Sequence, residues 1–319
     1  MYVLGIDTSN YTTSAALISD DSRVIQRKQL LPVKKGSVGL RQSDAVFHHT
    51  RQLHTLYKDL VSGIDTAEIK AVGVSTRPRA VEGSYMPCFT VGSSAAEIIA
   101  DTLRVPLYGF SHQEGHIAAA IHSSGAEDLF DREFIAFHVS GGTTEGVLCT
   151  PEGFGFRTEI IAKTLDLNAG QAIDRVGVML GLGFPCGKEL EKLALRFDGE
   201  VKVRPTLKGE DCCLSGLENI CRDMYDNNSE KEKIAYFCIK YIETTLAGMT
   251  EKLIEKYGRL PLLFAGGVMS NSMIRESFQN RFNAYFAEPE FSADNAAGIA
   301  KLAMREYTKR YADSTDSKT

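Results

Sequence analysis

The chain has 319 residues, of which 43% are hydrophobic and 24% charged, and its net charge is −5. These values are typical of globular proteins and exclude collagen-like, coiled-coil and intrinsically disordered chains. No run of about 18 apolar residues occurs, and the first residues lack a basic leader, so we expect no membrane partner and a soluble, cytoplasmic protein.

The chain begins with a strand, a polar turn and a second strand. Residues 3–7 and 14–18 are mainly apolar, and the turn between them is rich in hydroxyl side chains. A similar unit recurs where strands over residues 134–139 and 146–149 enclose a turn of glycine and threonine. In both units the backbone N–H groups of the turn are suited to face an anion. The repetition predicts two related lobes.

Strands and helices alternate along the rest of the chain, which predicts α/β layers. Further strands are predicted over residues 70–75 and 261–265, and helices over about 53–61, 93–103, 168–180, 230–257, from about 270, and 294–310. We predict a first lobe over residues 1–130 and a second lobe over residues 131–311. The polar residues 312–319 are predicted to form a disordered tail.

Positive charge is concentrated in one segment. Between Arg23 and Arg104 the sequence has 12 Lys and Arg residues against 7 Asp and Glu residues. The basic residues of this segment include Lys34, Lys35, Arg41, Arg77 and Arg79. We interpret them either as a face that binds nucleic acid or as an ordinary solvated surface, and charge alone favours the second interpretation.

His112 and His116 are candidate metal ligands, because a spacing of four residues puts both imidazoles on one face of a helix. Surface or core histidines are the alternative interpretation. A zinc peptidase of the H-E-x-x-H type is disfavoured, because Glu114 follows His112 by two residues and points about 200° around the helix. Seven cysteines without a C-x-x-C pair indicate neither a zinc ribbon nor a disulfide framework, and we expect them to be reduced.

Two glycine pairs lie where predicted strands end. Gly141-Gly142 follows the strand over residues 134–139, and Gly266-Gly267 follows the strand over residues 261–265. Glycine at such a place permits close approach of a nucleotide to the backbone. Simple turn formation is the alternative interpretation of each pair.

Taken together, these segments resemble the motifs of the TsaD family, formerly named Gcp or O-sialoglycoprotein endopeptidase (peptidase M22). The likeness runs from Gly5 to about Ala303. The matching segments are the His112 and His116 pair, residues 139–143 (V-S-G-G-H in the family, with Thr143 in place of the last His), 168–175, 185–187, 214–217 (F-S-G-L), 265–271 (A-G-G-V-x-x-N) and 291–295. Their number and order make the resemblance specific.

The resemblance implies the actin/Hsp70-like (ASKHA) fold of two ribonuclease-H-like lobes, with a nucleotide between them. It implies a tRNA N6-adenosine threonylcarbamoyltransferase, which moves the threonylcarbamoyl group of threonylcarbamoyl-AMP, an adenine nucleotide, to the adenosine next to the anticodon. tRNA and TsaB-like and TsaE-like helper proteins are the implied partners. The basic segment is then a candidate tRNA surface.

The resemblance also implies roles for individual residues. His112, His116 and Asp294 look like the ligands of one iron or zinc ion, although Asp294 is equally suited to cap a helix. Two His and one carboxylate leave coordination positions open, so that such a metal polarises a bound substrate. The implied substrate-binding residues are Val139, Ser140, Gly141, Gly142, Thr143, Asp174, Gly187 and Asn271. Of these, Asp174 and Asn271 are implied to hold the ribose and base, and no catalytic residue is assigned.

Besides Thr143, three segments depart from the family's pattern. Tyr11-Thr12 stands where the family has an acidic pair, Arg77-Pro78-Arg79 where it has G-P-G, and Ser111 where it has a further histidine. The second change adds two guanidinium groups, so we expect Arg77 or Arg79 to contact a phosphate. Because the first change removes two carboxylates, a paralogous carbamoyl transferase with another acceptor and a non-catalytic nucleotide-binding subunit are the alternative functions.

Overall fold

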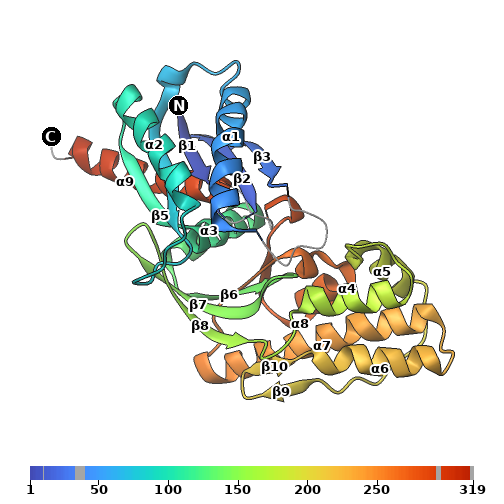
Figure 1. The fold of residues 1–319 in the computed structure, drawn as a ribbon. Coiled ribbons are helices and arrows are strands. Elements are labelled where there is room, and N and C mark those ends of the chain that lie inside the picture. The colour runs from blue at the N-terminus through green and yellow to red at the C-terminus, as the bar shows by residue number, and fades with distance from the viewer. Residues whose placement is uncertain (10, 33–39, 292–295, 317–319) are drawn as a thin grey trace. The chain divides into compact units, whose positions relative to one another are not determined.

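The computed structural model describes residues 1–9, 11–32, 40–291 and 296–316, with side chains up to Tyr311. The chain forms two compact units. The first lobe consists of Met1–Phe130, Pro151–Arg157 and Glu290–Thr319, and the second lobe consists of Asp131–Thr150 and Thr158–Pro289. Each lobe is built around one five-stranded sheet (Figure 1).

The sheet of the first lobe has the strand order β3-β2-β1-β4-β5. Its strands are β1 (Tyr2–Asp7), β2 (Thr12–Ser19), β3 (Val24–Leu30), β4 (Ile69–Arg77) and β5 (Leu107–Ser111), and its helices are α1 (Gln42–Leu60), α2 (Phe89–Leu103), α3 (His112–Ser124) and α9 (Ala297–Asp316). β1 pairs antiparallel with β2 and parallel with β4, and β4 pairs parallel with β5.

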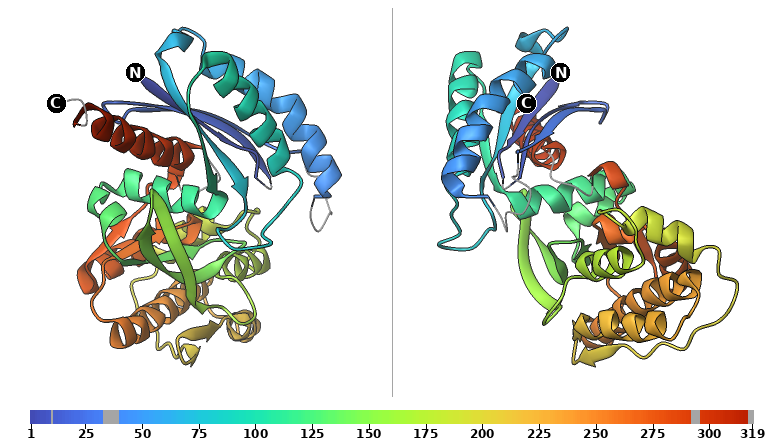
Figure 2. Two further views of the ribbon diagram at one scale, coloured as in Figure 1. Left: turned by 90° about the vertical axis from the view of Figure 1, so that its left-hand side faces the viewer. Right: turned by 45° about the vertical axis from the view of Figure 1, so that its right-hand side comes forward.

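Different helices cover the two faces of this sheet. Leu4 of β1 packs with Leu53 of α1 on one face. Gly5 and Gly73 occupy the other face, because side chains alternate along a strand. A Cβ on Gly5 would lie 2.5 Å from the carbonyl oxygen of Ala296. The absence of a side chain at Gly5 and Gly73 therefore lets α9 lie directly on the strands (Figure 2).

The position of α9 corrects the predicted division of the chain. The second lobe was predicted to extend over residues 131–311, but Glu290–Thr319 and Pro151–Arg157 belong to the first lobe. The cause is packing, since a Cβ on Gly298 would lie only 1.8 Å from the carbonyl oxygen of Gly115 in α3. The predicted disordered tail is wrong for residues 312–316, which continue α9. Extending an existing helix adds a hydrogen bond for each residue fixed.

The second lobe repeats the arrangement with the strand order β12-β11-β6-β7-β8. Its strands are β6 (Phe134–Val139), β7 (Thr144–Glu152), β8 (Gly155–Lys163), β11 (Leu262–Ala265) and β12 (Ala284–Phe286), and its helices are α4 (Ala169–Met179), α5 (Gly187–Ala194), α6 (Ser215–Asp226), α7 (Lys231–Tyr257) and α8 (Ser272–Arg281). A ribbon of β9 (Thr206–Lys208) and β10 (Asp211–Cys213) lies beside α7. Phe137 of β6 and Phe264 of β11 stack in the core with ring centroids 5.0 Å apart.

The prediction of two related lobes is confirmed by strand order and direction. β6 pairs antiparallel with β7 and parallel with β11, which pairs parallel with β12, just as β1 pairs with β2 and β4, and β4 with β5. The other predicted strands and helices are present, with ends that differ by a few residues or, for the first helix, by about three turns. In the part of the chain that the structure describes, no helix combines the length and apolar character that crossing a membrane takes.

Candidate functional site

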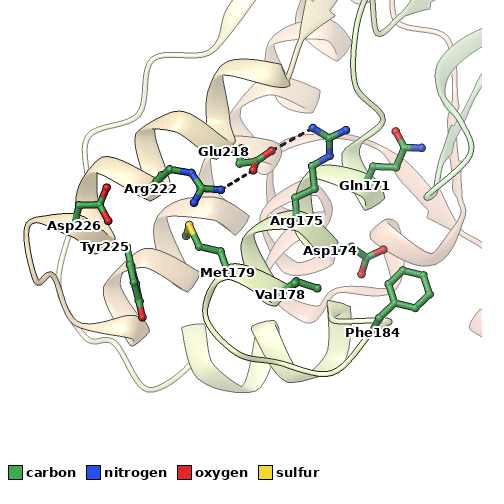
Figure 3. Close-up of a pocket in the computed structure, with 10 residues that line it drawn as sticks. All are labelled: Gln171, Asp174, Arg175, Val178, Met179, Phe184, Glu218, Arg222, Tyr225 and Asp226. Atoms are coloured by element: carbon green, nitrogen blue, oxygen red, sulfur yellow. Dashed lines mark hydrogen bonds and ion pairs between the residues drawn. The ribbon is translucent and has the colours of Figure 1, made fainter. Parts of the chain in front are cut away.

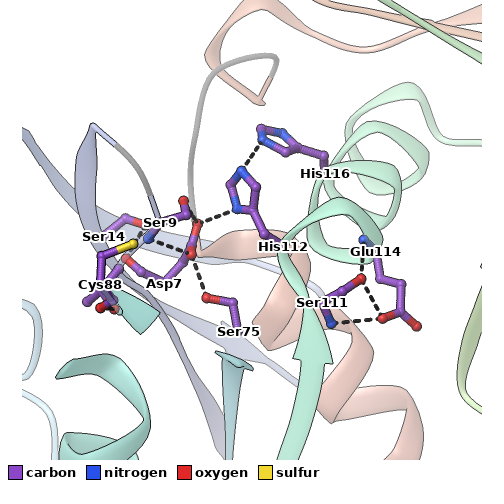
Figure 4. A network of polar contacts seen from close by, with 10 residues as sticks. Asp7, Ser9, Ser14, Ser75, Cys88, Ser111, His112, Glu114 and His116 are labelled. Carbon is purple, nitrogen blue, oxygen red and sulfur yellow. Dashed lines mark hydrogen bonds and ion pairs between the residues drawn. The ribbon is translucent and has the colours of Figure 1, made fainter. Parts of the chain in front are cut away.

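The turn after β1 is organised by the carboxylate of Asp7, which has no exposed surface (Figure 4). Asp7 Oδ1 accepts hydrogen bonds from the Ser9 backbone N–H (3.1 Å) and the Ser75 hydroxyl (2.5 Å). Oδ2 accepts one from the Ser9 hydroxyl (2.9 Å) and lies 3.0 Å from His112 Nδ1. The N–H group of Ser9, which was expected to face a bound anion, thus binds the chain's own carboxylate.

Sequence reasoning missed both Asp7 and Ser75 as site residues. Each lies at or near the carboxyl end of a buried strand that forms parallel pairs, and β1 and β4 are neighbours in the sheet. Polar side chains at the ends of adjacent parallel strands meet at one sheet edge. The location of Asp7 and Ser75 at the ends of two predicted strands was therefore the signal that could have identified them.

Helix α3 presents His112 and His116 on one face, as their spacing predicts. Their ring centroids are 4.3 Å apart, and the two Nε2 atoms face each other at 2.9 Å. The other ring nitrogen of His112 points to Asp7 (Figure 4). The two Nε2 atoms therefore lie within hydrogen-bond distance of each other.

This geometry fits a metal ion. With metal–nitrogen bonds of about 2.1 Å, two imidazole nitrogens lie about 3.0 Å apart at a right angle and about 3.4 Å apart at a tetrahedral angle. The observed 2.9 Å is close to the first value. A carboxylate on the other nitrogen of a metal-binding histidine is also usual. Asp294, the third predicted ligand, lies outside the described residues, and no group of three His, Cys, Asp or Glu side chains converges on a metal position within the described ones.

Ser111 and Glu114 cap the start of α3. The Ser111 hydroxyl accepts from the Glu114 backbone N–H (3.2 Å), and Glu114 Oε2 accepts from the Ser111 backbone N–H (2.8 Å) and hydroxyl (2.7 Å). This is a capping box. The Glu114 carboxylate is thereby held away from the histidines (Figure 4), which agrees with the argument against a zinc peptidase. It also gives a structural reason for serine at position 111.

The predicted glycine turn of the second lobe is held by internal hydrogen bonds, and its glycines face open space. The Ser140 backbone N–H donates to the Thr143 carbonyl (2.7 Å), and the Ser140 hydroxyl accepts from the backbone N–H groups of Gly142 (3.3 Å) and Thr143 (3.1 Å). A Cβ on Gly141 or Gly142 would meet no atom within 4 Å. The outer side of the turn therefore has space for a ligand close to the backbone.

Two other predicted segments pack against this turn. The Gly170 N–H of α4 donates to the Ser140 carbonyl (3.1 Å), and a Cβ on Gly170 would lie 2.6 Å from the Gly141 nitrogen. Gly266 has φ +101°, and a Cβ there would lie 2.2 Å from the Val139 carbonyl oxygen. Both positions require glycine because backbone approaches backbone. The structure thus brings residues 139–143, the start of α4 and the end of β11 together.

The three remaining predicted residues are also anchored in the second lobe. Asp174 of α4 accepts from the Cys186 backbone N–H (2.8 Å), which holds Gly187 at the start of α5. Asn271 caps α8, because its Oδ1 accepts from two backbone N–H groups of the first turn (3.1 and 3.2 Å). The Asn271 NH₂ group makes no hydrogen bond with a described residue, so it is available to a ligand.

A cavity of about 650 Å³ opens between α4 and α6 (Figure 3). Asp174 lies at one end of it beside Phe184, whose exposed fraction is 77%. Glu218 bridges two guanidinium groups of the wall, from Arg175 (3.2 Å) and Arg222 (2.9 Å). The cavity combines apolar and charged walls, as sites for small polar ligands do.

The family-like segment at residues 214–217 has a structural role. Asp166 accepts from the Leu214 backbone N–H (2.7 Å) and the Ser215 hydroxyl (2.6 Å) at the start of α6. Partial burial raises the pKa of Asp166, but these hydrogen bonds outweigh it and hold that pKa below its usual range. The segment therefore positions α6, one wall of the cavity.

The Arg77-Pro78-Arg79 segment borders the start of α3. Arg77 pairs with Ser111 in the β4–β5 register, and the Gln113 backbone N–H donates to the Pro78 carbonyl (3.0 Å). Arg77 is exposed, and no described residue forms an ion pair with it. The exposed guanidinium group of Arg77 therefore belongs to the strand residue that pairs with Ser111, directly before His112.

Comparison with known proteins identifies related sequences. The family described as TsaD, tRNA N6-adenosine threonylcarbamoyltransferase, matches residues 27–301. A tRNA N6-adenosine threonylcarbamoyltransferase of Methanopyrus kandleri is 29% identical over 309 residues, which cover 94% of this chain and 86% of that protein. A probable bifunctional tRNA threonylcarbamoyladenosine biosynthesis protein of Methanothermobacter thermautotrophicus is 27% identical, and the match covers 100% of this chain but 58% of that protein.

Solved structures establish the fold class. Full-length HypF in its phosphate- and nucleotide-bound form superposes with a TM-score of 0.58 at 14% identity, over 96% of this chain and 55% of that one. At this identity the likeness shows the fold alone. Together with the repeated strand order, it confirms the predicted actin/Hsp70-like arrangement of two ribonuclease-H-like lobes.

Proposed function

The chain belongs to the TsaD family, and from this membership we propose that it is a tRNA N6-adenosine threonylcarbamoyltransferase. The match over residues 27–301 is the observation that carries the proposal. In the reaction, the exocyclic amine of the adenosine next to the anticodon attacks the carbamoyl carbonyl of threonylcarbamoyl-AMP. The bond from that carbonyl carbon to the phosphate oxygen breaks, AMP leaves, and the amine loses a proton. Such a reaction on tRNA belongs in the cytoplasm.

In this proposal His112 and His116 hold one iron or zinc ion, with Asp294 as the third ligand. When bound, such a metal acts as a Lewis acid toward the substrate's oxygen atoms. The chain's own contribution is orientation, since the facing Nε2 atoms at 2.9 Å present one edge of a coordination sphere. Both metals accept two imidazoles and a carboxylate.

The second lobe is proposed to hold the nucleotide. Gly141 and Gly142 offer the phosphate open space close to a backbone whose turn the Ser140 hydroxyl holds in place. The Asp174 carboxylate and the Asn271 NH₂ group are proposed to hold the ribose and base, with Gly187 allowing close approach beside Asp174. The cavity between α4 and α6 supports this assignment, because Asp174 lines it.

One observation favours a second candidate function, a related carbamoyl transferase with another acceptor. Tyr11-Thr12 supplies no carboxylate where the family's pattern has two, and Thr12 is buried at the start of β2. The carboxylate of Asp7 does not replace them, because two serines and His112 already surround it. This difference bears on the acceptor and leaves the histidine pair and the glycine turn intact.

The test is transfer of labelled threonine to unmodified tRNA, with threonylcarbamoyl-AMP supplied and with TsaB-like and TsaE-like helper proteins added or left out. We expect incorporation by the full chain and none by a His112→Ala, His116→Ala variant. His122→Ala is the matched control, because His122 lies on the same helix outside the pair. Adenylate bound by the chain without incorporation in either condition would contradict the proposed acceptor and support the second candidate.

A further inference from the structure

We propose that Asp7 is a positioning residue for the metal site: with Ser9 and Ser75 it holds the His112 ring in the orientation that metal binding needs. This inference rests on the metal-binding role proposed above for His112 and His116. Asp7 was not among the site residues expected from the sequence or from the family resemblance.

The first support is the completeness of the polar shell around Asp7. The carboxylate is fully buried, and an isolated buried charge is strongly unfavourable. The Ser9 backbone N–H, the Ser9 hydroxyl and the Ser75 hydroxyl all donate to it. These three donors come from the turn and from β4, so they hold both carboxylate oxygens in place independently of His112.

The second support is the effect of this fixed carboxylate on the imidazole. The Asp7 carboxylate engages the Nδ1 side of the His112 ring at 3.0 Å. This contact leaves Nε2, the atom that faces His116 Nε2, as the ring nitrogen that can reach a metal. The Phe89 ring packs on the His112 ring in a T-shaped arrangement, with ring centroids 6.3 Å apart. Asp7 therefore determines which nitrogen is free to bind a metal and where it points.

A purely structural role makes a different prediction. If Asp7 only completes the turn after β1, its replacement lowers stability and leaves metal affinity unchanged. If it positions His112, its replacement weakens metal binding, because loss of such an outer partner typically lowers metal affinity about 10- to 100-fold. Metal affinity thus separates the two roles without any measurement of transfer activity.

The experiment measures the dissociation constant of Zn²⁺ for the metal-free full chain by competition with a chelating dye, and records the visible spectrum of the Co²⁺-loaded chain. Asp7→Asn keeps the size of the side chain and removes its charge, and we expect about 10- to 100-fold weaker Zn²⁺ binding and an altered Co²⁺ spectrum. Glu243→Gln is the matched control, because Glu243 is also buried and also accepts from a serine hydroxyl, but lies in the second lobe. It is expected to leave both readouts unchanged.

Ser75→Ala keeps the inference testable if Asp7→Asn does not fold. It removes one donor to Asp7 and leaves the Asp7–His112 contact, so we expect a several-fold loss of Zn²⁺ affinity. Ser14→Ala is its control, because the Ser14 hydroxyl donates to the Asp7 main-chain oxygen and not to the carboxylate (3.3 Å). Wild-type affinity in both Asp7→Asn and Ser75→Ala overturns the inference. Equal Zn²⁺ binding by wild type and the His112→Ala, His116→Ala variant instead overturns the proposed metal site.

Discussion

The two lobes share one strand order but end their central strands differently. Asp7 ends β1 and pairs with Ser14, whereas Val139 ends β6 and pairs with Thr144. In the first lobe the following turn is held by a buried carboxylate. In the second lobe it is held by the Ser140 hydroxyl, and its glycines face open space.

This difference bears on the two sites proposed above. In the first lobe the Asp7 carboxylate accepts from the N–H group of the turn and contacts an imidazole, which fits the proposed cation site. In the second lobe a hydroxyl holds the turn without negative charge and the glycines face open space, which fits the proposed anion site. One strand order thus carries two turns of different charge.

The largest expected effect tests whether the first lobe depends on its close helix packing. Gly298→Ala places a Cβ 1.8 Å from the Gly115 carbonyl oxygen, so we expect a loss of about 2–4 kcal/mol in the free energy of unfolding. Gly216→Ala in α6 is the control, since a Cβ there meets no atom within 4 Å and alanine favours a helix. Denaturant unfolding of both variants measures this, and equal stability would show that α9 shifts without cost.

The next prediction introduces negative charge into the turn of the second lobe. Gly141→Asp and Gly141→Asn are matched in size, and both side chains enter open space. We expect the Asp variant to bind the adenylate about 10-fold more weakly than the Asn variant, because only the carboxylate repels the phosphate. Calorimetric titration measures the ratio. A ratio near one would mean that the phosphate does not approach this turn.

The next prediction concerns Arg77, which adds a positive charge to the first lobe near the proposed metal site. We expect Arg77→Gln to weaken binding of a phosphate ligand about 5-fold, whereas Lys58→Gln, a charge-matched change at an exposed position of α1, has no effect. Binding is measured for AMP and for tRNA separately. For a tRNA contact, the slope of log affinity against log salt falls by about 0.7–0.9. No change for either ligand would refute the contact.

The smallest effect concerns the ion pair that ties α9 into the first lobe. Glu127 lies 2.9 Å from Lys301 Nζ and 3.6 Å from His122 Nδ1, and these two groups, His122 first and Lys301 second, lower the pKa of Glu127 to about 2 from its ordinary value of 4.5. Because the pKa is lower in the folded state, the stabilisation is complete above pH 4.5 and is lost as the pH falls toward 2.

We therefore expect Glu127→Gln to lower stability at pH 7 by less than about 1 kcal/mol, because the side chain is half-exposed and solvent screens the pair. The difference from wild type should shrink at pH 3. Thermal unfolding at both pH values measures it, with the exposed Glu152→Gln as the control. A difference that grows with acidity would contradict the lowered pKa.

The local features of this protein could be predicted from the sequence because they follow short-range periodicity. Runs of apolar residues at 3–7 and 134–139 predicted the two central strands, and the spacing of His112 and His116 predicted their common helix face. Glycine pairs at strand ends predicted the turn over residues 139–143. Each of these patterns depends on neighbours within four positions.

Contacts between residues far apart in the chain were decided by the tertiary structure alone. The contact of Asp7 with His112 spans 105 residues, and the placement of α9 on β1 joins the two ends of the chain. No periodic pattern reports such contacts, because packing and buried hydrogen bonds choose them only after the strands are assembled. The sequence by itself therefore determined two related lobes and the segments on which the candidate site residues lie. The tertiary structure decided that α9 belongs to the first lobe and that the Asp7 carboxylate contacts His112.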